Sequence, residues 1–269
     1  MNAIPSGVLA ARKPAGTRLL TDRNVFVATA ALLVVLTLAG FIPSSIEKVG
    51  AVQGGHRPPF PVVLHVHAVV MGLWLMLLLT QSTLAASGRR TLHRTLGMGG
   101  MVLLAVILVT GVLLIGATWQ PLWGPGSEAA MPAAELQDTR AFVSNILLMQ
   151  IRGLVTFPIF IIWALMLRRS DPDSHRRLML LGTAIPVLAG LDRLSASLGL
   201  TLMPASPLAM EAWLLASVLP LLLLDWRQRR LHFTTSAWLA VNAVMAVAVN
   251  LLWNTAWWQQ TAPRLVGVA

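Results

Sequence analysis

The side chains best suited to chemistry in this sequence are ionisable and amide groups that interrupt long apolar stretches. Placing a charged side chain in a lipid bilayer costs about 2.5 to 3.5 kcal/mol on insertion scales, so such residues usually face the protein interior. Near one end of the apolar stretches lie His67, Asn145, Arg152, Asp192, Arg193, Glu211, Asn250 and Asn254. We expect these side chains to line one polar pocket in the outer half of the molecule.

The spacing within the fourth stretch predicts a polar helix face. Asn145, Arg152 and Thr156 are separated by 7 and 4 residues, which places them in one narrow stripe at about 100° per residue. Gln150 lies about 140° from Asn145 on the same helix and is excluded from the pocket. The stripe predicts that Arg152 presents positive charge to an anionic or carbonyl group.

The same charges also have a purely structural interpretation. Two positive residues, Arg152 and Arg193, balance two negative ones, Asp192 and Glu211. Two buried ion pairs would hold neighbouring helices together without any further function.

The pair His65 and His67 raises the possibility of a metal site completed by Glu211 or Asp192, a nitrogen and oxygen set that suits zinc or iron. Such a site would fit a membrane-embedded, metal-dependent lipid hydrolase. Residues two apart on a regular helix diverge by about 200°, however, so both imidazoles reach one ion only if the helix is distorted. We expect one histidine to face the cavity and the other the interface.

Three further histidines follow basic turns: His93, His175 and His232. Imidazole is an axial ligand of heme iron, and neighbouring arginines can pair with heme propionates. This pattern predicts heme b at His93 and His175, and a quinone is the other cofactor considered. The competing interpretation is that these histidines and arginines contact lipid phosphates and mark the membrane boundary.

The elements that position these residues are seven apolar stretches, each long enough for the roughly 20 residues that a spanning helix needs. They cover residues 24–42, 60–86, 96–118, 141–167, 178–199, 208–225 and 234–256. The sequence therefore predicts an all-α, seven-transmembrane-helix bundle, arranged as a leading helix followed by three helical hairpins. Residues 1–23 are predicted as a basic tail, 119–140 as an interfacial loop or short cap, and 257–269 as a second tail.

Composition supports a membrane protein. Hydrophobic residues make up 56% of the chain and charged residues 11%, whereas soluble domains carry about a quarter charged residues. The net charge of +10 does not indicate nucleic-acid binding, because the basic residues recur in short clusters between apolar stretches. The absence of cysteine excludes thiolate-ligated heme and covalent c-type heme.

The distribution of the basic residues predicts orientation. Fourteen of the 20 Lys and Arg residues fall in the amino-terminal tail and in the turns near residues 89–94, 168–177 and 227–230. Because basic segments stay on the cytoplasmic side, we expect the amino terminus inside and the carboxy terminus outside a bacterial inner membrane. The lipid bilayer is thus the expected partner. Whether other membrane proteins also bind is left open by the sequence.

Three segments resemble those of a group of bacterial membrane proteins: LHRTLG at 92–97, HRRLML at 175–180 and HVHAVVMGLWLMLLLTQ at 65–81. They are similar to helix starts in uncharacterised bacterial multi-pass membrane proteins, some of which resemble accessory proteins of heme-copper oxidase assembly. The resemblance implies a redox or respiratory-assembly role that handles heme or quinone, and it transfers no catalytic residue. A small-solute transporter is the remaining alternative.

Overall fold

The computed structural model describes residues 22–200 and 208–268, and every regular element in these residues is helical. The helices are α1 (Asp22–Gln53), α2 (Val62–Ala86), α3 (Arg90–Trp123), α4 (Ser127–Ala130), α5 (Ala133–Leu167), α6 (Pro172–Ser197), α7 (Leu208–Ser217), α8 (Leu219–Arg227), α9 (Phe233–Leu252) and α10 (Ala256–Val266). The predicted all-α bundle is confirmed.

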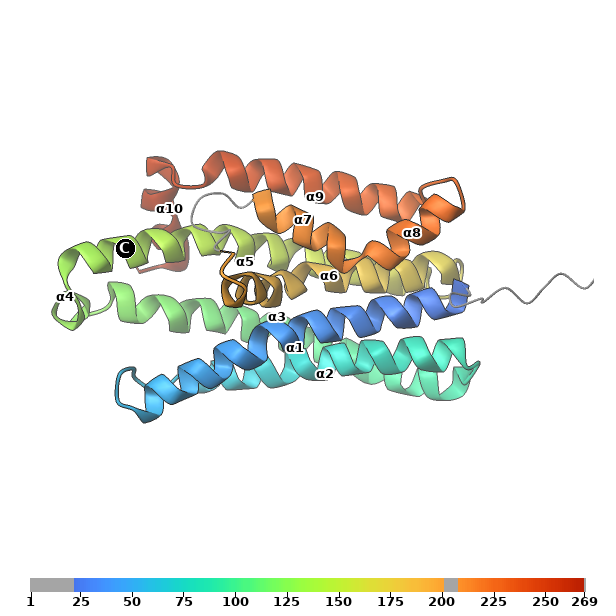
Figure 1. Cartoon of the computed structure of the whole chain (residues 1–269), viewed down its shortest axis with the longest axis horizontal. Helices are drawn as coiled ribbons and strands as arrows, with labels where there is room; N and C mark the ends of the chain where they lie inside the picture. The colour runs from blue at the N-terminus through green and yellow to red at the C-terminus, as the bar shows by residue number, and fades with distance from the viewer. Residues whose placement is uncertain (1–21, 201–207, 269) are drawn as a thin grey trace, which may run out of the picture.

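The long helices lie side by side along one axis (Figure 1). The α2–α3, α5–α6 and α8–α9 turns lie together at one end, which we call the basic end because it includes Arg89, Arg168, Arg169, Arg229 and Arg230. The α1–α2 connection, α4 and the carboxy terminus lie at the opposite end. This arrangement matches a leading helix followed by three hairpins.

Six of the described helices are long and apolar enough to cross a membrane, and α7 with α8 forms a seventh span if the two are counted together. Their outward faces remain apolar: Met166 is 75% exposed and Leu251 is 72% exposed. Exposing such faces to water is unfavourable, whereas lipid acyl chains contact them without this cost. The protein is therefore an integral membrane protein in contact with the bilayer.

The predicted sixth span, residues 208–225, is not one straight helix. It divides into α7 and α8, which meet at an angle of 65° around Val218. Val218 has non-helical backbone angles, and Pro220 follows at the start of α8. Proline cannot donate a backbone hydrogen bond to the preceding turn, so a continuous helix is interrupted here.

Helix α3 continues to Trp123, beyond the predicted end at residue 118, and α5 begins at Ala133. Helices of 34 and 35 residues are about 50 Å long, which exceeds the hydrocarbon thickness of about 30 Å. The segment predicted as a loop or short cap therefore consists of two helix ends and the short α4. Most of the predicted carboxy-terminal tail forms α10, which packs on α3 and α5.

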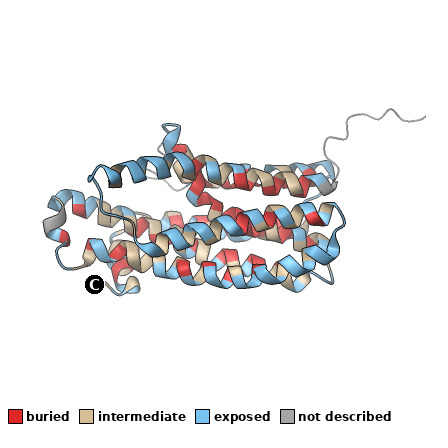
Figure 2. Cartoon of the chain, turned by 90° about the horizontal axis from the view of Figure 1, so that it is seen from below, coloured by how far each residue is buried: buried red, intermediate tan, exposed pale blue. Residues whose placement is uncertain are grey.

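Helix α6 is the centre of the bundle. It contacts α1, α2, α5, α7 and α9, and buried residues recur along its whole length. Figure 2 shows the buried residues of the whole bundle in red. The backbone of α6 touches that of α1 at one point, where Gly40 and Gly190 face each other. A Cβ atom built on Gly40 would lie 1.9 Å from the Gly190 carbonyl oxygen.

We predict that Gly40→Ala destabilises the protein by about 1 to 3 kcal/mol, because the added methyl group forces α1 and α6 apart. Gly116→Ala is the matched control, since nothing lies within 4 Å of a Cβ at Gly116 and alanine favours the helix. Thermal unfolding in detergent compares the two variants. Equal melting temperatures for Gly40→Ala and the wild type would contradict the crossing.

Candidate functional site

A buried group of three polar side chains lies between α5, α7 and α9. Arg152 is 2% exposed and forms a bidentate ion pair with Glu211, one arm of which joins Nη2 to Oε2 at 2.9 Å. Arg152 Nη2 also donates to Asn242 Oδ1 at 2.8 Å, and Asn242 Nδ2 donates to the Trp238 carbonyl. The three residues form a closed group, which we call the Arg152 triad.

The triad neutralises a charge that the bilayer cannot solvate. The Glu211 side chain is 22% exposed, whereas that of Arg152 is 1% exposed, so the carboxylate lies on the more accessible side of the pair. Arg152 Nε has no hydrogen-bond acceptor within the part of the chain that the structure describes. Glu211 and Asn242 thus accept from three of the five N–H donors of the Arg152 guanidinium.

Asn145 belongs to a separate group that attaches the end of the chain to α5. Its Nδ2 donates to Asn254 Oδ1 at 2.5 Å, and its Oδ1 accepts from the Asn254 backbone and from Gln259 Nε2. Trp258 Nε1 adds a bond of 2.7 Å to the Ser144 carbonyl. Asn254 has a φ of 60°, a left-handed conformation that asparagine tolerates. This group fixes the turn between α9 and α10.

The remaining predicted pocket residues have other neighbours. Arg193 donates to the Ala189 carbonyl and lies over the Phe41 ring at 4.5 Å, so it faces α1. Asp192 is within electrostatic reach of Lys48, also on α1, and of Arg193. Asn250 donates to the Ala246 carbonyl of its own helix at 2.8 Å. The structure thus joins Arg152 to Glu211 and Asn145 to Asn254, and it directs Asp192 and Arg193 toward α1.

The two histidines of α2 point in different directions, as their spacing predicts. His67 Nδ1 lies 2.9 Å from Thr110 Oγ1 on α3, whereas His65 is exposed and contacts the Phe60 ring edge-on. The Thr110 hydroxyl donates to backbone carbonyls of its own helix, so it accepts from His67. Within residues 22–200 and 208–268, no three His, Cys, Asp or Glu side chains are placed to hold a metal.

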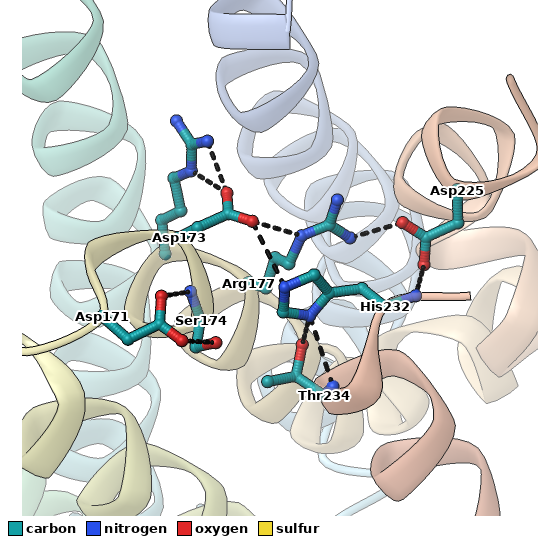
Figure 3. Close-up of polar contacts among 8 residues, drawn as sticks. Asp171, Asp173, Ser174, Arg177, Asp225, His232 and Thr234 are labelled. Atoms are coloured by element: carbon teal, nitrogen blue, oxygen red, sulfur yellow. Dashed lines mark hydrogen bonds and ion pairs between the residues drawn. The ribbon is translucent and has the colours of Figure 1, made fainter. Parts of the chain in front are cut away.

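A second charged group lies at the basic end, between α6, α8 and the start of α9 (Figure 3). Arg177 and Asp225 are 1% and 0% exposed, and Arg177 Nη1 donates to Asp225 Oδ1 at 2.7 Å. Asp225 Oδ2 accepts from the His232 backbone at 3.2 Å. Asp173 approaches Arg177 Nε and His232 Nε2, each at 3.3 Å, and it also pairs with Arg176.

His232 caps α9. Its Nδ1 accepts from the Thr234 backbone N–H at 3.3 Å and lies 2.8 Å from the Thr234 hydroxyl. A backbone N–H only donates, so Nδ1 has no proton and Nε2 carries the proton that faces Asp173. Burial, followed by the neighbouring Arg177 guanidinium, lowers the pKa of His232, and these effects outweigh the attraction of Asp173, Asp225 and Asp171.

His93 and His175 both lie at the basic end, at the starts of α3 and α6. His175 Nδ1 is 2.8 Å from the Ala164 carbonyl oxygen on α5, and His93 Nδ1 is 3.3 Å from the Gln81 carbonyl oxygen on α2. Because a carbonyl only accepts, each Nδ1 carries a proton and each neutral Nε2 presents a lone pair. The two imidazoles are within electrostatic reach of one another, and Arg168 is within reach of His175.

Several residues of the two buried charged groups were not predicted from the sequence. Asn242 and Asp225 were not predicted as site residues, and Arg177 was predicted as part of the basic turn beside His175, not as the partner of a buried acid. The available signal was the same as for Arg152: an amide in the middle of a span and an acid at its end must have polar partners. Thr110 gave no comparable signal, because threonine hydroxyls commonly bond to their own helix.

Comparison with known proteins gives no match to a family model, a curated protein or a solved structure.

We predict that the stability of the fold decreases as pH falls below about 6.5, the ordinary pKa of histidine. The native state favours neutral His232, so its contribution is fully present above the unfolded pKa and is lost as pH falls through the lower, folded value. His232→Asn retains a capping side chain but does not titrate. Its melting temperature should fall a few degrees less than that of the wild type between pH 7 and pH 5. Identical pH profiles would contradict the assignment.

Proposed function

We propose that this integral membrane protein binds heme b at the basic end and has a redox or respiratory-assembly role. The observation that supports the proposal most directly is the pair His93 and His175, whose Nδ1 atoms both face backbone carbonyls. Each imidazole is thereby held with an Nε2 lone pair that has no partner among the described residues. Two such nitrogens, on the first turns of α3 and α6, suit axial ligation of a heme iron.

The carbonyl contacts are the kind of support that heme and metal ligands need. A ligating histidine usually donates its second ring N–H to a carbonyl or carboxylate, which fixes its tautomer and ring orientation. Ala164 does this for His175 at 2.8 Å. Both histidines are partly exposed, so a planar ligand can approach Nε2 from outside the packed helices.

The charges around the pair suit the two propionates of heme. Arg168 is within electrostatic reach of His175, and Arg94 follows His93 directly; both arginines are exposed. Guanidinium groups pair with carboxylates through two parallel hydrogen bonds. Gln81 Nε2 donates to the His93 carbonyl at 3.0 Å, and Gln81 Oε1 is buried without a partner among the described residues.

Heme iron in this position would supply one-electron exchange at the membrane boundary. His93 and His175 would hold the iron, Ala164 and Gln81 would orient the imidazoles, and Arg94 and Arg168 would bind the propionates. The resemblance of residues 92–97 and 175–180 to helix starts of membrane proteins similar to oxidase-assembly accessory proteins supports the same role.

Quinone binding at Arg152 has less support, because Glu211 and Asn242 engage both Nη atoms.

Solute transport is a second candidate function, favoured by the 65° bend between α7 and α8. Transporters often bind substrate where a spanning helix is interrupted, usually at corresponding positions in two repeated halves. Among the described helices, α7 and α8 form the one bent pair that is together long and apolar enough to cross a membrane. Heme binding is supported by more independent contacts and is the function we favour.

The heme proposal predicts that the protein, purified in detergent from heme-replete cells, shows a Soret absorbance. His93→Ala and His175→Ala should each reduce this absorbance at least severalfold, because each removes one axial nitrogen. His65→Ala is the matched control, since His65 is exposed on α2 and lies outside the pair. A colourless wild-type protein, or equal absorbance in all three variants, would overturn the proposal.

A further inference from the structure

An open concavity of about 480 Å³ lies at the end of α8 and the turn into α9. It is lined by Leu222, Asp225, Trp226, Arg229, Arg230 and Leu231. Its lining combines two guanidinium groups with exposed apolar side chains: Trp226 is 77% exposed and Leu231 is 57% exposed. This combination suits a ligand with an anionic head and an apolar body.

The backbone of the turn fixes where the two arginines emerge. Arg229 has a φ of 54°, and its N–H donates to the Trp226 carbonyl at 3.0 Å. The Arg230 N–H donates to the Asp225 carbonyl at 3.2 Å. These bonds close the end of α8 in the manner of a left-handed helix cap. Both arginines therefore project from an ordered turn.

The acid that lines the concavity does not neutralise these arginines. Asp225 is fully buried, and its two carboxylate oxygens accept from Arg177 and from the His232 backbone. In the part of the chain that the structure describes, Arg229 and Arg230 have no carboxylate within 4.0 Å. The concavity therefore presents net positive charge and offers no free acid to a cationic group.

We propose that this concavity binds the phosphate of an anionic phospholipid, with Arg229 and Arg230 at the phosphate and Trp226 and Leu231 beside the glycerol and upper acyl chain. The site lies where a spanning segment ends, which is the depth of lipid headgroups, and exposed tryptophan is common at that depth. Basic pockets at the ends of membrane helices bind anionic headgroups. A zwitterionic lipid fits less well, because its ammonium group would find no unpaired carboxylate.

Native mass spectrometry of the full chain in detergent tests the site. Phosphatidylglycerol and phosphatidylcholine of identical acyl composition are titrated against the wild type, Arg229→Gln/Arg230→Gln and Arg89→Gln/Arg90→Gln. The second double variant is the matched control, because Arg89 and Arg90 are also adjacent, exposed and at the basic end. All four arginines are exposed, and melting temperatures verify that each variant is folded.

We expect phosphatidylglycerol to bind the wild type more tightly than phosphatidylcholine does. The Kd of phosphatidylglycerol should rise about tenfold or more in Arg229→Gln/Arg230→Gln, which corresponds to a loss of about 1.4 kcal/mol of binding free energy. In the control variant the same Kd should rise less than about threefold. Equal losses in both double variants would indicate only general attraction to a basic surface and would overturn the proposal. Equal binding of phosphatidylcholine, or displacement of phosphatidylglycerol by millimolar inorganic phosphate, would also overturn it.

Discussion

The bent span formed by α7 and α8 depends on two buried arginines, each of which requires an acid. An arginine inside a bundle that faces lipid has no water to solvate it, so its charge must be neutralised by protein groups. Arg152 on α5 pairs with Glu211 on α7, and Arg177 on α6 pairs with Asp225 on α8. Each half of the bent span thus carries one acid and is attached to a different neighbour. The bend at Val218 directs the two acids toward their separate partners.

The same ion pairs fix the rotation of the helices that position the histidines. Arg177 and His175 lie two residues apart on α6, so their side chains diverge by about 200° around the helix. With Arg177 directed toward Asp225 and α8, His175 faces the opposite side, where it meets the Ala164 carbonyl of α5. The contact between Gly40 and Gly190 holds α6 closely against α1 on a further side. The side of α6 on which His175 lies is therefore a consequence of how α6 is held.

The sequence was most informative where one physical requirement acts alone. Apolar length identified the spans, and the need to neutralise buried charge predicted that Arg152 and Glu211 belong to one polar group. The contact between Asn145 and Asn254 likewise follows from amides that must find partners. The 65° bend could not be predicted, because an apolar stretch specifies length and not direction. Pro220 did not identify the break either, since Pro43, Pro158 and Pro186 lie inside helices that continue. The direction of Arg193 toward Phe41 depends on the rotation of α6 against α1, which the sequence of one helix does not determine.

The pairing of Arg152 with Glu211 is tested most directly by a double-mutant cycle. The free energy of unfolding is measured by titration with sodium dodecyl sulfate for the wild type, Arg152→Gln, Glu211→Gln and the double variant. Each single variant leaves an uncompensated buried charge, so we predict that the double variant is less destabilised than the sum of the singles by more than about 1 kcal/mol. Additive effects of the two substitutions would show that the ion pair does not hold the bent span to α5.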